Sequence, residues 1–237
     1  MTLTTRTSSA AAQQSLPQRL NRLRAGVLGA NDGIVSTAGL VFGVAGATTD
    51  SGAVLVAGLA GMVAGALSMA GGEYVSVSSQ RDSEVAALRE QERELSSDPA
   101  GKLRQLADHY AARGLAPALA DEVATELSRH DALDAHAEVF LNLDADDQVS
   151  PWAAARASLV SFITGSAIPL VALVASPVAV RLPLTVVAVL VALLATGLIS
   201  ARLGGARVVP AVIRNLVVGS LAMGLTYLVG SLVGQHL

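Results

Sequence analysis

The stretch LGANDGIVSTAGLVFGVAGA, residues 28–47, is apolar, small or hydroxylated except at Asn31 and Asp32. It belongs to an apolar block that runs from about Ala25 to Ala47, and a helix of this length crosses a hydrocarbon core of about 30 Å. A carboxylate inside such a block is energetically costly, because a bilayer cannot solvate its charge. The stretch therefore predicts a membrane helix with a functional polar position.

The whole chain has the composition of a membrane protein. Of its 237 residues, 52% are hydrophobic and 15% are charged, whereas a soluble domain carries about 25% charged residues. Its mean hydropathy is +0.53. There is no cysteine, which excludes disulfides, thiolate metal sites and thiol catalysis. Residues 1–24 form a polar, basic segment without the apolar core of a signal peptide.

Four further apolar blocks follow the first one. A polar turn at 48–52 leads to a second block that ends near Val77, and three more lie near 157–175, 184–201 and 215–233, with Pro169 expected to kink the third span. We therefore place transmembrane helices 1 and 2 in residues 25–80 and transmembrane helices 3 to 5 in residues 151–237.

Residues 81–150 have a different character. They hold 16 of the 19 acidic residues and three of the four histidines. Their Ala, Leu, Glu and Arg content favours helices, with breaks at SSDPAG and RGLAP. The predicted fold is an all-α membrane protein with five transmembrane helices and a cytoplasmic three-helix domain inserted between the second and third spans.

The predicted orientation rests on two arginine clusters, one before the first span and one between the fourth and the fifth. The clusters consist of Arg19, Arg22, Arg24, Arg202, Arg207 and Arg214. Because short cytoplasmic flanks are enriched in Lys and Arg, both clusters are expected in the cytoplasm. The N-terminus and the acidic domain then also lie in the cytoplasm, whereas the opposite orientation leaves both clusters outside.

Outside residues 81–150 the chain has three acids, Asp32, Asp50 and Glu73. Asp50 lies in the turn between two spans, but Asp32 and Glu73 both lie about 12 Å from the cytoplasmic face at 1.5 Å per residue. Met69 is four residues before Glu73 and shares its helical face. Two carboxylates at one depth favour a cation site, and a thioether beside them favours Fe²⁺ over Mg²⁺ or Ca²⁺.

Other interpretations of these residues stay open. Asp32 can cap a helix break at NDG, Glu73 can extend toward the interface, and Met69 can simply pack. Four GxxxG spacings permit close helix contact within or between chains. They are Gly29 to Gly33, Gly39 to Gly43, Gly61 to Gly65 and Gly230 to Gly234.

Two motifs carry a family resemblance. GANDGIVSTAGLVFGVAGA and AGALSMAGGEYVSVSSQRDSE, followed by an acidic helical domain and three spans, resemble the vacuolar iron transporter (VIT) family in its bacterial form. The resemblance implies a homodimer in a lipid bilayer, here a bacterial cell membrane. It also implies an antiporter that exports the divalent ions Fe²⁺ and often Mn²⁺ in exchange for protons. Asp32 and Met69 match positions that line the path, and Glu73 belongs to the GGEYVSVSSQRD stretch.

The acidic domain departs from the family pattern, in which glutamates and a Met- or His-containing turn bind several divalent ions. Glu94 and His136 match that pattern, and Glu90 stands beside Gln91, where a glutamate is expected. The departures are Gln91, Lys102, Gln105 and Phe140. We predict a weakened site centred on Glu90, Glu94 and His136. A replacement by Glu126, His130 and Asp134, which recur every four residues on one predicted helix face, stays open beside ordinary surface.

Other function classes find little support. The chain has no phosphate-binding Gly-rich loop with Lys-Ser/Thr, no His-Glu-x-x-His and no Gly-x-Ser-x-Gly. We therefore expect no enzyme and no cofactor. Residues 81–150 carry seven Lys and Arg against 16 acids, which disfavours nucleic acid as a partner. Two hypotheses stay: proton-coupled transport of a divalent metal, and a non-transporting membrane protein whose acidic domain docks a partner or senses metal.

Overall fold

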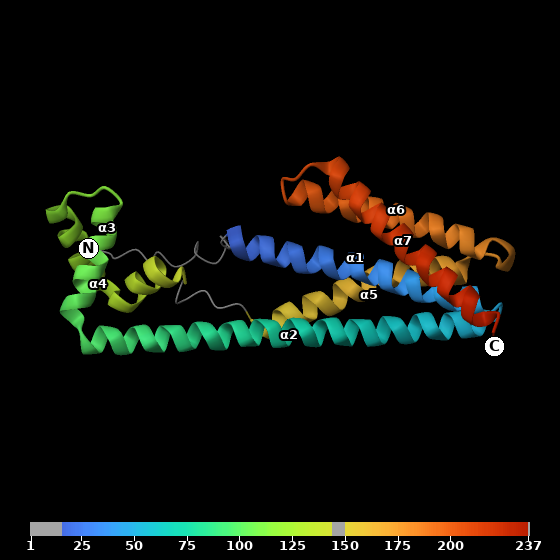
Figure 1. Cartoon of the computed structure of the whole chain (residues 1–237), viewed down its shortest axis with the longest axis horizontal. Helices are drawn as coiled ribbons and strands as arrows, with labels where there is room; N and C mark the ends of the chain where they lie inside the picture. Colours follow the sequence, from blue (N-terminus) through green and yellow to red (C-terminus); the bar gives the residue numbers. More distant parts are fainter. Residues whose placement is uncertain (1–15, 144–149, 237) are drawn as a thin grey trace, which may run out of the picture. The chain divides into compact units, whose positions relative to one another are not determined.

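The structure is a computed structural model that describes residues 16–143 and 150–236, with side chains from residue 26 onward (Figure 1). Every regular element in the described part of the chain is helical. The chain divides into two compact units. The spanning unit comprises the chain up to Tyr74 and from Trp152 onward, and the insert unit comprises Val75–Pro151.

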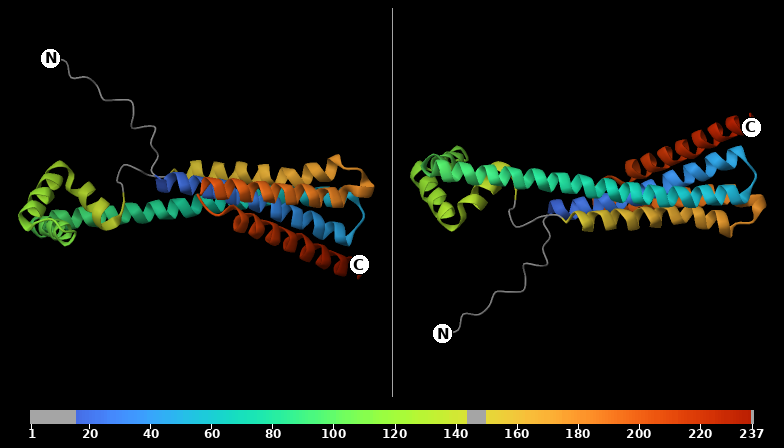
Figure 2. Two further views of the ribbon diagram at one scale, coloured as in Figure 1. Left: turned by 90° about the horizontal axis from the view of Figure 1, so that it is seen from above. Right: turned by 90° about the horizontal axis from the view of Figure 1, so that it is seen from below.

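Five helices are long and apolar enough to cross a membrane, which confirms the predicted all-α class and the number of spans. They are α1 (Leu16–Ala47), α2 (Ser51–Ser97), α5 (Pro151–Ala175), α6 (Arg181–Leu203) and α7 (Val208–Gly234). A short 3-10 helix, η3 (Val178–Val180), precedes α6. The C-terminal end of α7 lies at the same end of the spanning unit as the turn between α1 and α2, as both views of Figure 2 show.

The helices are longer than the apolar blocks that predicted them. α2 continues past Val77 to Ser97, because no Gly or Pro interrupts the chain between Glu73 and Ser97. It therefore contributes its first part to the spanning unit and its last part to the insert unit. Pro169 lies inside α5, where it is fully buried and does not end the helix.

α1 is the centre of the spanning unit. Ile34, Ala38 and Phe42 on one side of it pack in a core with residues of α6 and α7, among them Leu193 and Met223. On another side, Val41 of α1 packs in a second core, together with Val54 of α2 and with Leu170 and Leu173 of α5. The other four spans are therefore arranged around the first.

Glycines set how closely α1 approaches its neighbours. A Cβ atom at Gly33 would lie 2.3 Å from the carbonyl oxygen of Phe162 in α5, and one at Gly230 of α7 would lie 1.8 Å from the carbonyl oxygen of Gly43. Next to the first contact, the Ser166 hydroxyl donates a 3.2 Å hydrogen bond to the Gly33 carbonyl oxygen. The small-residue spacings thus serve helix packing inside this chain.

The insert unit contains the end of α2 and two further helices, α3 (Pro99–Ala112) and α4 (Pro117–His136), the latter extended by a π-helical turn, η2 (Ala137–Leu141). Asp98 begins α3 by accepting a 2.8 Å hydrogen bond from the Gly101 N–H, and Pro99 follows it at the first helical position. The helices thus end at the two segments where the sequence predicts breaks. That this unit lies in the cytoplasm stays a prediction.

We predict that Gly230→Ala destabilises the spanning unit by about 1–3 kcal/mol, because the added methyl group forces α1 and α7 apart. The matched control is Gly224→Ala in the same helix, where an added Cβ meets nothing within 4 Å. That substitution is expected to be neutral or to stabilise by less than about 1 kcal/mol. Reversible unfolding of both variants in detergent measures the difference. Equal stabilities would contradict the packing described for α1.

Candidate functional site

A cavity of about 370 Å³ lies between α1, α2 and α5. It contains the two membrane residues that the sequence singles out first, Asp32 and Met69. On each of α1 and α2 the lining residues recur at intervals of about four, so each helix presents one face to the cavity. The lining residues are Asp32, Ser36, Leu40, Gly61, Gly65, Ser68, Met69 and Phe162.

The cavity has a polar side and an apolar wall. The polar side carries the half-buried Asp32 carboxyl, the hydroxyls of Ser36 and Ser68, and the Met69 thioether. Phe162 of α5 is 2% exposed, and its ring closes against Gly65, where a Cβ would lie 2.3 Å from the ring. Within the described residues no Lys or Arg pairs with Asp32. One carboxylate, hydroxyl oxygens and a thioether are a donor set suited to a borderline divalent ion.

Glu73 does not line this cavity. It is partly buried one helical turn after Met69 on α2, beside Tyr74, whose ring centroid lies 4.8 Å from that of Trp152 in α5. The structure therefore brings Asp32 and Met69 together and leaves Glu73 next to them along α2. A metal-binding role for these three residues stays a prediction.

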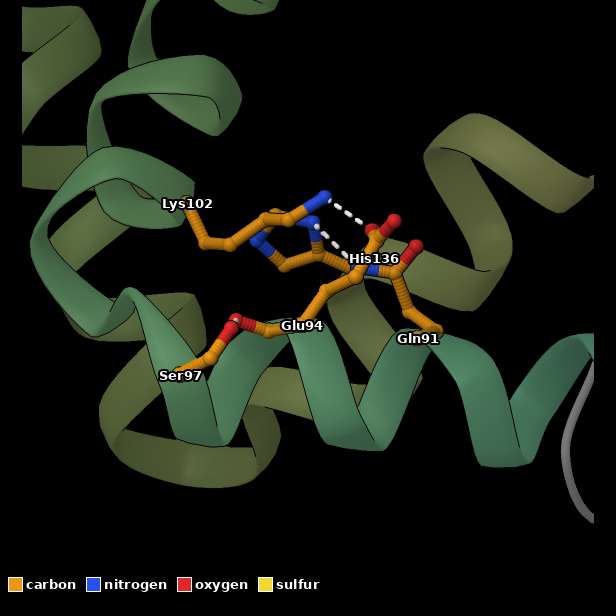
Figure 3. A network of polar contacts seen from close by, with 5 residues as sticks. All are labelled: Gln91, Glu94, Ser97, Lys102 and His136. Atoms are coloured by element: carbon orange, nitrogen blue, oxygen red, sulfur yellow. Dashed lines mark hydrogen bonds and ion pairs between the residues drawn. The ribbon is translucent and has the colours of Figure 1, made fainter.

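The insert unit gathers a second group of polar side chains from three helices (Figure 3). Glu94 and Gln91 extend from α2, Lys102 from α3 and His136 from α4, and they point toward one another. The Lys102 ammonium forms an ion pair with the Glu94 carboxylate. The amide nitrogen of Gln91 lies 3.5 Å from Nδ1 of His136.

His136 is the most enclosed member of this group, with no exposed surface. Its Nε2 has no hydrogen-bond partner in the described part of the chain. The ring of Phe140, in the π-helical turn, lies 5.3 Å away between centroids. Burial lowers the pKa of the imidazole, as does the positive charge of Lys102, and Glu94 opposes them in part. The neutral form of the ring is therefore favoured.

These contacts explain what the departures from the family pattern do. Lys102 neutralises the Glu94 carboxylate, which faces His136, and Gln91 supplies an amide beside the ring instead of a charge. Glu90 is not part of the group, because it is exposed and pairs with Arg93 at 3.2 Å. Among the described residues, no three His, Asp or Glu side chains are grouped so that they could hold a metal ion.

The alternative ligand set on α4 is not formed. Its members are Glu126, His130 and Asp134, and the expectation that they share one helix face is wrong, because Asp131 has non-helical angles, φ −159° and ψ 103°. Asp131 instead begins a new helical segment by accepting a 2.9 Å hydrogen bond from the Asp134 N–H. Glu126 pairs with Arg129 at 2.9 Å.

Sequence reasoning did not find several residues of these two groups. Ser36 is four residues after Asp32, so helical spacing from that predicted ligand could have identified it. Ser68 directly precedes Met69, and a spacing of three or four residues from Met69 or Glu73 does not select it. No pattern in the sequence points to Phe162, because its contact with Gly65 depends on how α5 crosses α2. The same holds for the approach of Gln91 to His136.

A model of the VIT family matches residues 23–231, which include every residue that lines the cavity. The vacuolar iron transporter of Acanthamoeba castellanii is 44% identical over 211 residues, which are 89% of this chain and 78% of that protein. Vacuolar iron transporter homolog 1 of Oryza sativa subsp. japonica is 39% identical over 219 residues, 92% of this chain and 76% of that protein. Vacuolar iron transporter homolog 4 of Arabidopsis thaliana is 34% identical over 220 residues, 92% and 87% respectively.

We predict that Lys102→Gln raises the pKa of His136, because it removes a nearby positive charge and leaves Glu94 unpaired. In the unfolded chain the imidazole of His136 binds a proton below about pH 6.5, whereas in the folded chain its pKa is lower. The insert unit therefore loses stability as the pH falls below that value toward the lower pKa of the folded imidazole, and Lys102→Gln weakens this loss. An NMR titration of ¹³C-labelled histidine in the full-length protein measures the pKa. Arg129→Gln, which removes an exposed charge from α4, is the control, and an unchanged or lower pKa in Lys102→Gln would contradict the assignment.

Proposed function

This chain belongs to the VIT family, and on that premise we propose that it transports Fe²⁺, and also Mn²⁺, out of the cytoplasm in exchange for protons. The family match and the iron-transporter names of the relatives support metal transport. The observation that carries the proposal is the cavity between α1, α2 and α5, in which a carboxylate and a thioether lie together inside the span-forming part of the chain. The bacterial cell membrane and the cytoplasmic side of the insert unit are part of the same proposal.

The metal ion is the substrate of this cavity. Asp32 supplies negative charge in surroundings of low dielectric, where its attraction for a cation is stronger than in water. The hydroxyls of Ser36 and Ser68 and the Met69 thioether replace part of the hydration shell of the ion. Sulfur favours Fe²⁺ over the harder Mg²⁺, which prefers oxygen ligands.

A homodimer fits the charge of this site. One carboxylate balances half the charge of a divalent ion, and the lining residues Ser36, Leu40 and Ser68 are exposed, so the cavity is open on one side. We propose that a second copy of the chain closes that side and adds a second Asp32. Two carboxylates and two thioethers then surround the ion near the two-fold axis.

Proton coupling follows from the chemistry of a carboxylate. A protonated carboxyl loses most of its attraction for a cation, so protons that enter from the opposite side displace the metal ion. Asp32 is the coupling group in this scheme, and Glu73, one turn after Met69, passes the ion between the cavity and the cytoplasm. A gradient is the driving force because the sequence has no ATP-binding loop of the Walker type.

The contacts of Lys102 favour a second candidate function. Its ion pair with Glu94 occupies a carboxylate beside His136, which makes the insert unit a poor collector of metal ions. In the alternative, the protein does not transport, and its insert unit docks a partner or senses metal. The two functions differ in whether a metal ion crosses the membrane.

We predict that Asp32→Ala and Glu73→Ala each lower Fe²⁺ flux at least about tenfold in proteoliposomes, because they remove charge and not packing from the path. Asp50→Ala, which removes the carboxylate of the turn between α1 and α2, is the matched control and is expected to transport normally. Normal flux in both Asp32→Ala and Glu73→Ala would rule out the proposed path.

Met69→Leu tests the thioether in the same assay. It keeps the side-chain volume and removes the sulfur, so the preference is expected to move from Fe²⁺ toward Mn²⁺. Met62→Leu, at a packing position of the same helix beside the Val41 core, is its control. An unchanged ion ranking in Met69→Leu would return Met69 to a packing role.

We further predict that the native insert unit binds metal ions weakly and that Lys102→Glu, Gln105→Glu and Phe140→Glu together increase the number of ions bound. The substitutions replace a cation, an amide and an apolar ring by carboxylates at the positions where the family resemblance leads us to expect glutamates. Anaerobic calorimetry with Mn²⁺ compares the two insert units in full-length protein that carries Asp32→Ala, so that the membrane cavity does not contribute. Tight binding of several ions by the native insert unit would contradict the prediction.

A further inference from the structure

A second cavity of about 370 Å³ lies on a different side of α1, between α1, α6 and α7. Its polar lining comes from Asn31 of α1, Ser200 of α6, and Arg214 and Asn215 of α7. Val27 and Leu28 of α1 contribute to its apolar wall. Asn31 and Asp32 are neighbours in the sequence but face two different cavities, because successive residues of a helix point about 100° apart.

The charge of this second cavity is unbalanced. The exposed Arg214 has no ion-pair partner in the described part of the chain. The sequence from Pro151 to Leu237 contains no Asp or Glu, and Arg202 and Arg207 flank the turn between α6 and α7. Neither α6 nor α7 therefore offers a carboxylate to the Arg214 guanidinium, and Asp32 of α1 lines the other cavity. The guanidinium is thus free to pair with an anionic ligand.

Asn31 adds a requirement of a different kind. Its side-chain oxygen is buried and accepts no hydrogen bond from any described residue. A buried acceptor without a donor destabilises the folded protein by about 1–3 kcal/mol. The neighbouring Asn215 does not satisfy it, because its amide nitrogen is directed at the Leu193 carbonyl oxygen at 3.5 Å and the Thr196 hydroxyl at 3.4 Å. A ligand that fits this cavity carries an anionic group and a hydrogen-bond donor.

The position along the helices indicates where such a ligand comes from. Val27 is near the start of the span Gly26–Ala47, Leu203 is the last residue of α6, and Arg214 is in the second turn of α7. The cavity is thus at one end of the spans, at the depth where phospholipid headgroups meet the hydrocarbon core. In a bilayer, an apolar wall suits acyl chains and an arginine at this depth suits lipid phosphates.

We propose that this cavity binds the headgroup of phosphatidylglycerol. The lipid phosphate pairs with the Arg214 guanidinium, and a glycerol hydroxyl donates a hydrogen bond to the side-chain oxygen of Asn31. A net anionic lipid is favoured over the zwitterionic phosphatidylethanolamine, because the cavity lining contains the Arg214 guanidinium and no carboxylate. The bound headgroup then links the start of α1 to the turn between α6 and α7. This inference does not depend on which ion the protein transports.

Native mass spectrometry of the delipidated full-length protein tests the proposal with four lipids. Phosphatidylglycerol is expected to bind at least about tenfold more tightly than phosphatidylcholine, since the choline cation offsets the phosphate charge and phosphatidylcholine has no headgroup donor for Asn31. Phosphatidylmethanol, which is anionic but has no headgroup hydroxyl, and phosphatidylethanolamine are expected to lie between them. Asn31→Leu is expected to lower the affinity for phosphatidylglycerol to that for phosphatidylmethanol. The affinity for phosphatidylmethanol itself is expected to stay unchanged.

Two arginine variants separate a built site from a general attraction to charge. Arg214→Gln is expected to lower the affinity for phosphatidylglycerol about tenfold. Arg202→Gln removes an exposed charge outside the cavity lining and is expected to change this affinity less than about twofold. Equal losses in the two variants would overturn the proposal. Competition by inorganic phosphate at equal concentration would also overturn it, since the site would then take a free anion. If Arg214→Gln does not fold, the wild type decides: equal binding of phosphatidylcholine and phosphatidylglycerol means that no such site exists.

Discussion

The contact on which the spanning unit depends is the close approach of α1 to the helices around it. At Gly33 no side chain separates α1 from the backbone of α5, and at Gly43 the α1 backbone meets Gly230 of α7. These contacts hold α1 in one rotation about its own axis. The direction of each polar side chain on α1 follows from that rotation.

The fixed rotation explains why an Asn and an Asp stand together in an apolar block. Gly33 packs on α5, Asp32 faces the cavity beside α2, and Asn31 faces the cavity beside α6 and α7. Three successive residues thus differ in function: Gly33 makes a helix contact, Asp32 supplies charge and Asn31 supplies a hydrogen-bond acceptor. In the insert unit the Glu94 carboxylate is balanced by Lys102 beside His136. The costly uncompensated carboxylate is kept in the membrane, where the proposed transport needs it.

The all-helical class and the five spans could be predicted, because apolar length alone decides whether a helix can cross a bilayer. The depth of a residue in the membrane could not predict that Asp32 and Met69 line one cavity, because Asp32 and Glu73 have the same predicted depth. Depth fixes a position along a helix, and the rotation of that helix depends on contacts such as Gly33 with Phe162. The prediction from the spacing of Glu126, His130 and Asp134 was wrong for a related reason. It required a continuous helix, and the backbone of Asp131 interrupts that helix.

The central claim is that a divalent metal ion occupies the cavity lined by Asp32 and Met69. Anomalous X-ray diffraction at the manganese edge, from crystals of the full-length protein soaked in Mn²⁺, tests it most directly. We predict an anomalous peak between Asp32 and Met69 that disappears in Asp32→Ala. Peaks confined to the insert unit, or a membrane peak that persists without the Asp32 carboxylate, would contradict it.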